Sequence, residues 1–242
     1  MPIDPKTGKE VLCCVVDLKQ ASPEYKEVEQ AFSRTMGGGF SSGMVTPYTG
    51  IVKIQRIQNQ KLYSQYIARK RAIDKANPEG HKNEQTLFHG CDGRVINDIN
   101  HEGLNRNFAG KNGEFNKQSK SSSIVTIAIK FLYIILRAVT FCYFMSSATA
   151  LGRGVYFARN ASYSASDTYT PRDANGHKHM YYARVLTGQY AKGNSTLLVP
   201  PPKDRSNPSV LHESVVDNMH NPAIFVVFQD AHVYPEYLIT FH

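Results

Sequence analysis

The 242-residue sequence predicts an α+β fold built on a largely antiparallel sheet. Two helices are predicted before residue 80, whereas four strands are predicted after Met145 with little helix between them. Strands that gather after helices, instead of alternating with them, are typical of antiparallel sheets with helices packed against them. The length suits one large domain or two small ones, and no internal repeat is visible.

The two N-terminal helices are predicted from their start signals and their apolar faces. Residues 22–24 combine a serine cap, a proline at the first helical position and an acid in the first turn. Tyr25, Val28 and Phe32 then fall on one face of the helix. A second helix is predicted over 60–76, where an Asn-Pro pair ends it.

The remaining elements are predicted from short apolar runs and turn residues. The predicted strands are 10–18, 51–57, 86–90, 154–158, 179–188, 223–228 and 236–241. Short helices are predicted within 94–105, with Gly103 as a stop signal, and over the polar segment 160–169. The glycine-rich segment 36–50 and the proline-rich segment 200–208 are predicted to be loops.

The composition restricts the class of protein without identifying a function. The net charge of +8 fits a solvated basic surface, and it also fits an anionic partner such as a dinucleotide or a nucleic acid. The four cysteines, Cys13, Cys14, Cys91 and Cys142, form no CxxC pair. This pattern is typical of reduced thiols in the cytoplasm or nucleus. Charged residues precede any apolar run, so no signal peptide is expected.

Two local patterns could carry chemistry but have simpler interpretations. His177 and His179 have the spacing of two metal ligands on one strand face, yet no third ligand is evident, so an ordinary polar face is preferred. Cys91 lies two residues from His89, which could suggest a Cys/His nucleophile. No carboxylate that would orient the histidine is evident, and this interpretation is not preferred.

One ordered set of residues goes beyond local patterns. His89 and Gly90 end a predicted strand, Tyr156 lies within a later one, and Ser164 and Tyr169 follow on a polar segment. Taken singly, the two tyrosines are more typical of core or rim positions, and the serine of a helix cap. Only their order along the chain raises them to candidate site residues.

This set resembles the ADP-ribosyltransferase signature of the poly(ADP-ribose) polymerase (PARP) family. The resemblance is strongest to the mono-ADP-ribosylating, macrodomain-bearing branch, the B-aggressive-lymphoma type. It implies the ADP-ribosyltransferase fold, with a mostly antiparallel split sheet and flanking helices, in a single catalytic domain over 1–242. The segments that carry it are KIQRIQN, LFHG, GLNRNFAGKN, GRGVYFARNASYSASDTY, KHMYYARVLTGQYAKG and FVVFQDAHVYPEYLITF.

The resemblance also implies a role for each site residue, with NAD as co-substrate and no metal. The Gly90 backbone would hold the nicotinamide carboxamide, Ser164 would donate a further hydrogen bond to it, and Tyr169 would stack on its ring. His89 would hydrogen-bond the adenosine ribose, and Tyr156 would line the opposite wall. Nicotinamide leaves as a neutral group from a cationic ring, so the enzyme needs orientation and charge stabilisation more than a general acid.

A third position bears on the product. Polymer-forming members have a glutamate at the start of a late strand, and the resemblance places Ile224 there. An isoleucine side chain accepts no hydrogen bond, so transfer of a single ADP-ribose unit is implied, with Glu or Asp side chains as acceptors. Glu236 is the nearest other carboxylate in the sequence, and it is expected to lie on the next strand, outside the site.

An apolar segment interrupts the resemblance. Removing 113–147 leaves a sequence that matches the family without a break, so these residues form an insert in the donor loop, the segment that closes over NAD. An artefact of the gene model, such as translated intron, is the preferred interpretation, and a real insertion is the alternative. Within it, 124–145 has the length of a membrane span, but Lys130 and Arg137 reduce its insertion energy to near zero.

Two functions follow from the resemblance. The first is an NAD-dependent protein mono-ADP-ribosyltransferase that modifies partner proteins and itself, requires no nucleic acid and acts in the nucleus or cytoplasm. The second is a catalytically impaired pseudoenzyme that binds NAD or ADP-ribosylated partners, with its donor loop disrupted by the insert. The presence of His89 favours the first, because some relatives that lose this histidine are inactive. Membrane contact is expected only if 124–145 is real.

Overall fold

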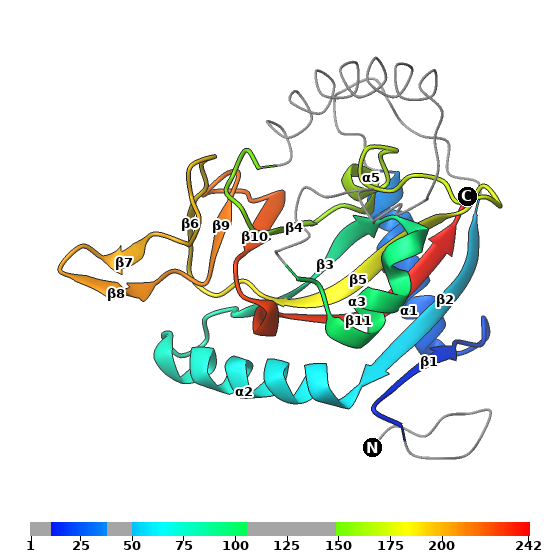
Figure 1. Cartoon of the computed structure of the whole chain (residues 1–242), viewed down its shortest axis with the longest axis horizontal. Helices are drawn as coiled ribbons and strands as arrows, with labels where there is room; N and C mark the ends of the chain where they lie inside the picture. Colours follow the sequence, from blue (N-terminus) through cyan, green and yellow to red (C-terminus); the bar gives the residue numbers. More distant parts are fainter. Residues whose placement is uncertain (1–10, 38–49, 106–148) are drawn as a thin grey trace, which may run out of the picture.

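The computed structural model describes residues 11–37, 50–105 and 149–242 (Figure 1). These residues form a nine-stranded sheet in the order β1-β2-β11-β5-β3-β4-β10-β9-β6, and β7 and β8 form a separate hairpin. The hairpin projects from the body of the domain beside β6 and β9 (Figure 1). The strands are β1 (Cys13–Asp17), β2 (Ile51–Asn59), β3 (Glu84–Cys91), β4 (Val155–Ala158), β5 (Lys178–Leu186), β6 (Tyr190–Lys192), β7 (Pro202–Asp204), β8 (Asn207–Leu211), β9 (Ser214–Val216), β10 (Ile224–Val227) and β11 (Val233–Phe241).

The sheet is antiparallel at each described pairing except the parallel pair of β6 with β9. It is also nearly divided in two. β3 pairs with β5 from Glu84 to Cys91, but it pairs with β4 only where Phe88 lies opposite Ala158. The predicted α+β class and the mostly antiparallel split sheet are therefore confirmed.

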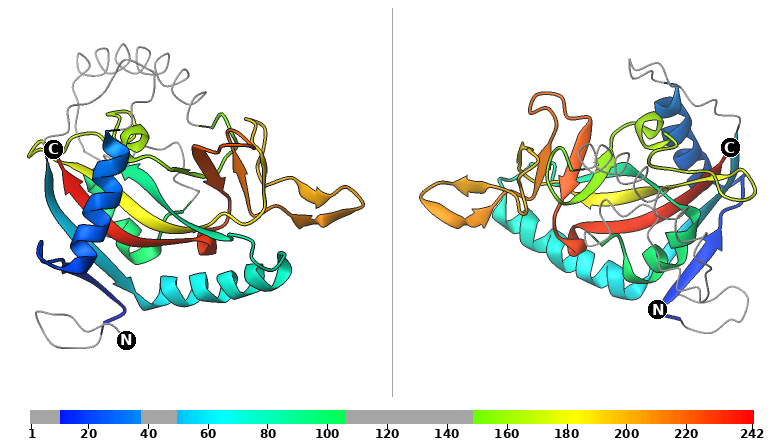
Figure 2. Two further views of the ribbon diagram at one scale, coloured as in Figure 1. Left: turned by 180° about the vertical axis from the view of Figure 1, so that it is seen from behind. Right: turned by 45° about the horizontal axis from the view of Figure 1, so that its top comes forward.

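Helices cover both faces of this sheet. The described helices are α1 (Pro23–Met36), α2 (Gln60–Ala76), α3 (Ile96–Glu102) and α5 (Ala161–Ser164), with 3-10 turns η1 (Gly93–Val95) and η3 (Asp230–His232). α1 and α5 pack on the face that carries Phe88 and Met180, whereas α3 packs on the face that carries Leu87 and Phe157. Figure 2 shows α1 across the sheet from behind, and Figure 1 shows α3 in front of it.

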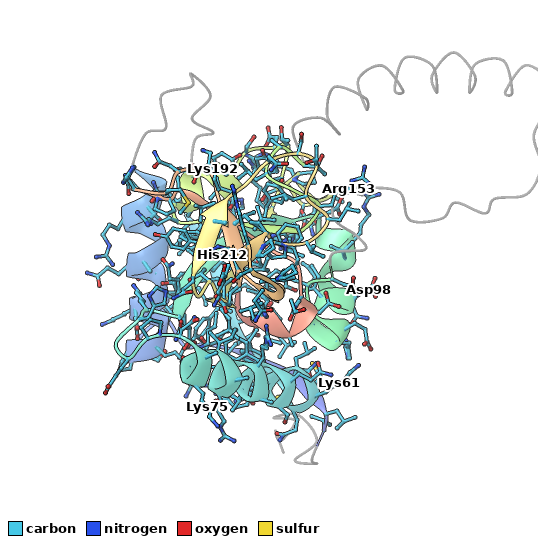
Figure 3. The ribbon with its side chains drawn as sticks, turned by 90° about the vertical axis from the view of Figure 1, so that its left-hand side faces the viewer. Lys61, Lys75, Asp98, Arg153, Lys192 and His212 are labelled. Atoms are coloured by element: carbon cyan, nitrogen blue, oxygen red, sulfur yellow. The ribbon has the colours of Figure 1, made fainter. Side chains whose placement is uncertain are left out.

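The start of each long helix is fixed by a side-chain cap. Ser22 accepts a hydrogen bond from the Tyr25 N–H, with Oγ and N 3.2 Å apart. Asn59 accepts one from the Leu62 N–H at 3.0 Å, and its own amide donates to the carbonyl of Asn100 at 2.8 Å. α2 spans the 60–76 range expected from the sequence, and Lys61 and Lys75 extend from it into solvent (Figure 3).

Several sequence-based expectations are wrong in detail. The predicted helix over 160–169 is a single turn, α5, because serine, threonine and aspartate side chains compete for the backbone there. The predicted loop over 200–208 contributes β7 and the start of β8. Strands β6 and β9, three residues each, were not predicted.

Two expectations concern segments that the structure does not describe. The insert 113–147, with its apolar stretch 124–145, and most of the glycine-rich loop 36–50 lie outside the described residues. Within 11–37, 50–105 and 149–242, no helix has both the length and the apolar character needed to cross a membrane.

The two caps give a matched stability prediction. Ser22→Ala is expected to lower the free energy of unfolding by about 1 kcal/mol, because it removes one cap bond at a partly exposed site. Asn59→Ala should cost about 3 kcal/mol, because it also leaves buried carbonyl groups without their donor. Urea unfolding measures the loss of stability in each variant. Equal losses would show that the hydrogen bonds from Asn59 to the carbonyls of α3 add nothing to stability.

Candidate active site

The candidate site lies where the two parts of the sheet diverge. His89 follows Phe88 directly on β3, and Tyr156 precedes Ala158 by two residues on β4. The His89 ring bridges the gap between the strands, since its Nδ1 lies 2.8 Å from the Tyr156 carbonyl oxygen. A side chain thus makes the hydrogen bond across the gap just past the last strand pairing. The family resemblance gave these two residues separate roles in one site, and in the structure they are in contact.

This contact fixes the protonation of His89. A carbonyl oxygen only accepts, so Nδ1 must carry the proton, and Nε2 keeps a lone pair that can accept a hydrogen bond. Burial lowers the pKa of His89, and the bond to the Tyr156 carbonyl opposes this effect only partly. The ring is therefore neutral near pH 7 and presents an acceptor to the site.

Gly90 is the point where two distant segments touch. A Cβ placed on Gly90 would collide with the Thr170 hydroxyl oxygen, and it would lie 2.5 Å from the Ser164 carbonyl oxygen. The sequence argument assigned this glycine to close approach of a ligand. In the structure, the protein's own segment 164–170 requires it. β3 also continues one residue past Gly90, to Cys91.

Ser164 is held from both sides. Its hydroxyl donates to the Phe88 carbonyl oxygen at 3.2 Å, and its own carbonyl accepts from the Thr170 hydroxyl at 2.6 Å. Both side chains are buried. The Ser164 proton therefore has a protein acceptor already, and a ligand must compete for it. Thr170 was not among the predicted site residues, because a threonine after a tyrosine carries no signal in the sequence.

Tyr156 uses its hydroxyl for the protein. The hydroxyl donates to the Gly152 carbonyl oxygen and accepts from the Leu151 N–H, each at 2.9 Å. Burial raises the pKa of Tyr156 to about 12, so the phenol stays neutral. Its hydroxyl anchors the turn that precedes β4, and its ring packs against an apolar cluster that includes Ala158 and Ile224.

Tyr169 is part of an aromatic pair that the sequence analysis missed. Its ring stacks on Tyr163, with centroids 5.3 Å apart and planes inclined by 20°, and their hydroxyl oxygens are 3.2 Å apart. A flat ligand between two stacked rings needs about 7 Å, twice a contact distance. A ligand ring must therefore use the other face of Tyr169.

Ile224 lies beside the site on β10. It pairs with Ala158 and is only 6% exposed. Asp217 fixes the start of this strand, because its Oδ1 accepts the N–H groups of Ala223 at 2.9 Å and Ile224 at 3.0 Å. The apolar cluster around Ile224 consists of Ala158, Val215, Val226 and Phe228, with Leu151, Tyr156, Tyr163, Ala191 and Leu197 at its margin.

Other candidate residues lie apart from this cluster. Glu236 is on β11, which β5 and β3 separate from β4, and its carboxylate lies 3.8 Å from the Arg184 guanidinium. The sequence interpretation of Glu236 as a residue of another strand therefore holds. Cys91 is buried in the core, and burial raises the pKa of its thiol, which disfavours a nucleophilic thiolate.

The histidine pair has a different environment from the one expected. His177 lies one residue before β5, whereas His179 lies on that strand. Both contact Asp173, whose Oδ2 lies 3.0 Å from His179 Nε2 and 3.9 Å from His177 Nδ1. In the described part of the chain, no group of three or more His, Cys, Asp or Glu residues has an arrangement that could hold a metal ion.

Comparison with known proteins gives one family and several relatives. Residues 22–117 and 119–242 match the poly(ADP-ribose) polymerase catalytic domain family. Human protein mono-ADP-ribosyltransferase PARP14 is 41% identical over 228 residues, which cover 94% of this chain and 10% of the relative. Mouse protein mono-ADP-ribosyltransferase PARP10 is 31% identical over 96% of this chain and 20% of its own length. Mouse protein mono-ADP-ribosyltransferase PARP12 is 30% identical over 93% and 25%. The chain thus spans a quarter or less of the length of these relatives.

The packing at Gly90 gives a testable prediction. Gly90→Ala should lower the free energy of unfolding by about 1–3 kcal/mol, because the new methyl group overlaps Thr170 and Ser164. Adding Thr170→Ala should recover part of the loss, since only the Ser164 carbonyl then remains in the way. Gly37→Ala is the control, because nothing lies within 4 Å of its added Cβ. If the stability loss of the double variant equals the sum of the two single losses, the added methyl group at position 90 does not meet Thr170.

Proposed function

Because the chain belongs to the poly(ADP-ribose) polymerase catalytic domain family, we propose that it is an NAD-dependent protein mono-ADP-ribosyltransferase. It transfers one ADP-ribose unit to protein side chains, Glu or Asp, and releases nicotinamide. One observation carries the proposal. Gly90 on β3 meets the segment 164–170, which carries Ser164 and Tyr169, at the split of the sheet, and the neighbouring His89 ring contacts β4 there. This arrangement offers backbone, hydroxyl and aromatic contacts to one small flat amide.

The contacts suit the nicotinamide end of NAD. The Gly90 backbone holds the carboxamide, and the Ser164 hydroxyl turns from the Phe88 carbonyl to bind it. The face of Tyr169 that Tyr163 does not cover stacks on the pyridine ring, and such a pair contributes about 0.5–1.5 kcal/mol beyond the buried area. At the other end of NAD, Nε2 of the neutral His89 ring accepts a hydrogen bond from a hydroxyl of the adenosine ribose, and the Tyr156 ring closes the opposite wall.

The chemistry needs little acid–base help from these residues. The bond between the ribose carbon and the nicotinamide nitrogen breaks, and the electron pair goes to the pyridinium, which leaves as a neutral molecule. The ribose carbon becomes oxocarbenium-like, as in glycoside hydrolysis. An acceptor carboxylate then forms the new bond to this carbon. Positioning of the leaving group supplies the main catalytic effect.

Transfer of a single unit fits the surroundings of Ile224. The side chain at this position is apolar and packs in an apolar cluster, so it offers no acceptor to a ribose hydroxyl. Chain growth needs that hydroxyl to be activated. The relatives named above are mono-ADP-ribosyltransferases, which supports the same product here.

The wider assignment extends the sequence expectations. The chain acts as a single catalytic domain over 1–242, with 113–147 as an insert in the donor loop, and it modifies partner proteins and itself without nucleic acid. A location in the nucleus or cytoplasm is proposed. Among the described cysteines, Cys13 and Cys91 form no disulfide, which supports a reducing compartment.

The proposed function is tested by transfer of labelled ADP-ribose from NAD to protein. The full chain and a variant without Gly113–Ser147 are each incubated with NAD, and the product mass is measured. Attachment of single units is expected. His89→Ala should reduce transfer at least about tenfold, since it removes both the Tyr156 contact and the Nε2 acceptor.

A matched control separates this effect from general loss of a histidine. His101 also has Nδ1 2.8 Å from a backbone carbonyl, that of Asn97, but it lies on exposed α3. His101→Ala should transfer as the wild type does. Binding of NAD with no transfer by either form of the chain would instead support the pseudoenzyme.

The position of Ile224 gives a prediction about the product. Ile224→Glu is expected to add single units only, because a carboxyl group in this apolar cluster has a raised pKa and is held neutral. Ile224→Leu, the size-matched control, should keep both product and stability, with a change of less than about 1.5 kcal/mol. Long polymers from Ile224→Glu, seen by gel shift, would show that one side chain decides the product.

A further inference from the structure

A fully buried lysine lies under the candidate site. Lys178 is the first residue of β5 and is only 1% exposed. On the same sheet face lie Phe88 and Met180, and Lys178 pairs with Phe241 on β11. Lysine is almost never fully buried unless its charge is paired, so its partners identify what the ammonium does here.

Both partners of Lys178 belong to the segment that carries the site. Its Nζ lies 2.6 Å from the Ala165 carbonyl oxygen and 2.6 Å from Asp167 Oδ1. Ala165 follows Ser164 directly, and Asp167 precedes Tyr169 by two residues. The hydrogen bond from Lys178 lowers the pKa of Asp167, so this carboxylate is charged under ordinary conditions.

The lysine closes the loop between α5 and β5. This loop begins at Ala165, directly after α5, and ends at Lys178, the first residue of β5, so the Lys178–Ala165 bond joins its two ends. Within the loop, the backbone N–H groups of Tyr169 and Thr170 both donate to the Ser166 carbonyl, at 2.9 and 2.8 Å. Thr170 in turn contacts Gly90 and Ser164. The position of the segment 164–170 thus depends on the hydrogen bond from Lys178 to Ala165.

Packing alone does not account for this residue. An apolar side chain of similar length would fill the slot without the cost of removing an ammonium from water. Asp167 is 69% exposed, so only the lysine side of this ion pair is buried, and the two short contacts of Lys178 fix where Ala165 and Asp167 lie. The Lys178 ammonium stabilises one arrangement of residues 165–167.

We propose that Lys178 is a positioning residue for the nicotinamide subsite, which it builds by clamping Ala165 and Asp167 so that Ser164 and Tyr169 face Gly90. This inference rests on the proposed function, because it assigns Lys178 to that same site. Lys178 itself contacts the Ala165 carbonyl and the Asp167 carboxylate, so it acts on a bound amide through the segment that it holds.

A second buried lysine provides a matched control. Lys203 Nζ lies 2.6 Å from Glu213 Oε1 and 2.7 Å from Asn77 Oδ1, and its side chain is 16% exposed. It joins β7 to the segment before β9, at the end of the sheet that carries the projecting hairpin (Figure 1). Lys203→Met therefore removes a buried lysine pair without touching the segment 164–170.

The experiment compares wild type, Lys178→Met and Lys203→Met in the full chain. The dissociation constant of free nicotinamide, the KM and kcat for NAD, and the thermal midpoint are measured for each. Lys178→Met is expected to weaken nicotinamide binding and raise the KM for NAD about tenfold. Lys203→Met should lower the midpoint to a similar extent and keep the wild-type values for both ligands.

The outcomes separate the inference from the proposed function. Equal nicotinamide affinity in the two variants would overturn the positioning role. If Lys178→Met does not fold, Asp167→Ala decides, because this carboxylate is 69% exposed and its removal opens no cavity in the core. Asp167→Ala should lower the midpoint, because the Lys178 ammonium loses its charged partner, and it should weaken nicotinamide binding about threefold; wild-type affinity would overturn the inference. Wild-type protein that neither binds nicotinamide nor transfers ADP-ribose would overturn the proposed function instead.

Discussion

The candidate site depends on a sheet that is continuous at only one pair of residues. Phe88 and Ala158 join β3 to β4, and beyond them the strands diverge. A fully paired sheet would leave no room between these strands for side chains or a ligand, whereas a complete break would leave the two parts free to shift. The hydrogen bond from His89 to the Tyr156 carbonyl spans the opening. One strand pairing and one side-chain bond together set the width of the site.

The second constraint is the packing of the segment 164–170 against β3. Gly90 has no side chain to hold this segment away, and the Thr170 hydroxyl and the Ser164 carbonyl occupy the space that a Cβ would take. Lys178, on β5, restrains the same segment through its hydrogen bond to the Ala165 carbonyl. The residues that contact the ligand in the proposal are thus held by residues that contact only protein. Supporting contacts of this kind hold the ligand-binding groups in the geometry that the reaction needs.

The sequence was informative where a local rule decides the outcome. The Ser22 cap and the helix over 60–76 follow from local start and stop signals, and the family resemblance placed His89 and Tyr156 in one site. It was uninformative where tertiary packing decides. Nothing local marks Thr170 or Lys178 as part of the site, because their partners lie on other elements. The short strands β6 and β9 escaped prediction for the same reason, since three residues carry too little periodicity.

The neutral state of His89 has an electrostatic consequence for the proposed reaction. The pyridinium of NAD carries a positive charge, and that charge moves onto the ribose as nicotinamide departs. A protonated imidazole elsewhere on the same bound dinucleotide would still oppose both species, because charges within a protein are screened less than in bulk water. Burial of the His89 ring keeps that charge away while leaving a lone pair to hold the sugar. Burial of this one ring therefore favours binding of a positively charged substrate over repulsion of it.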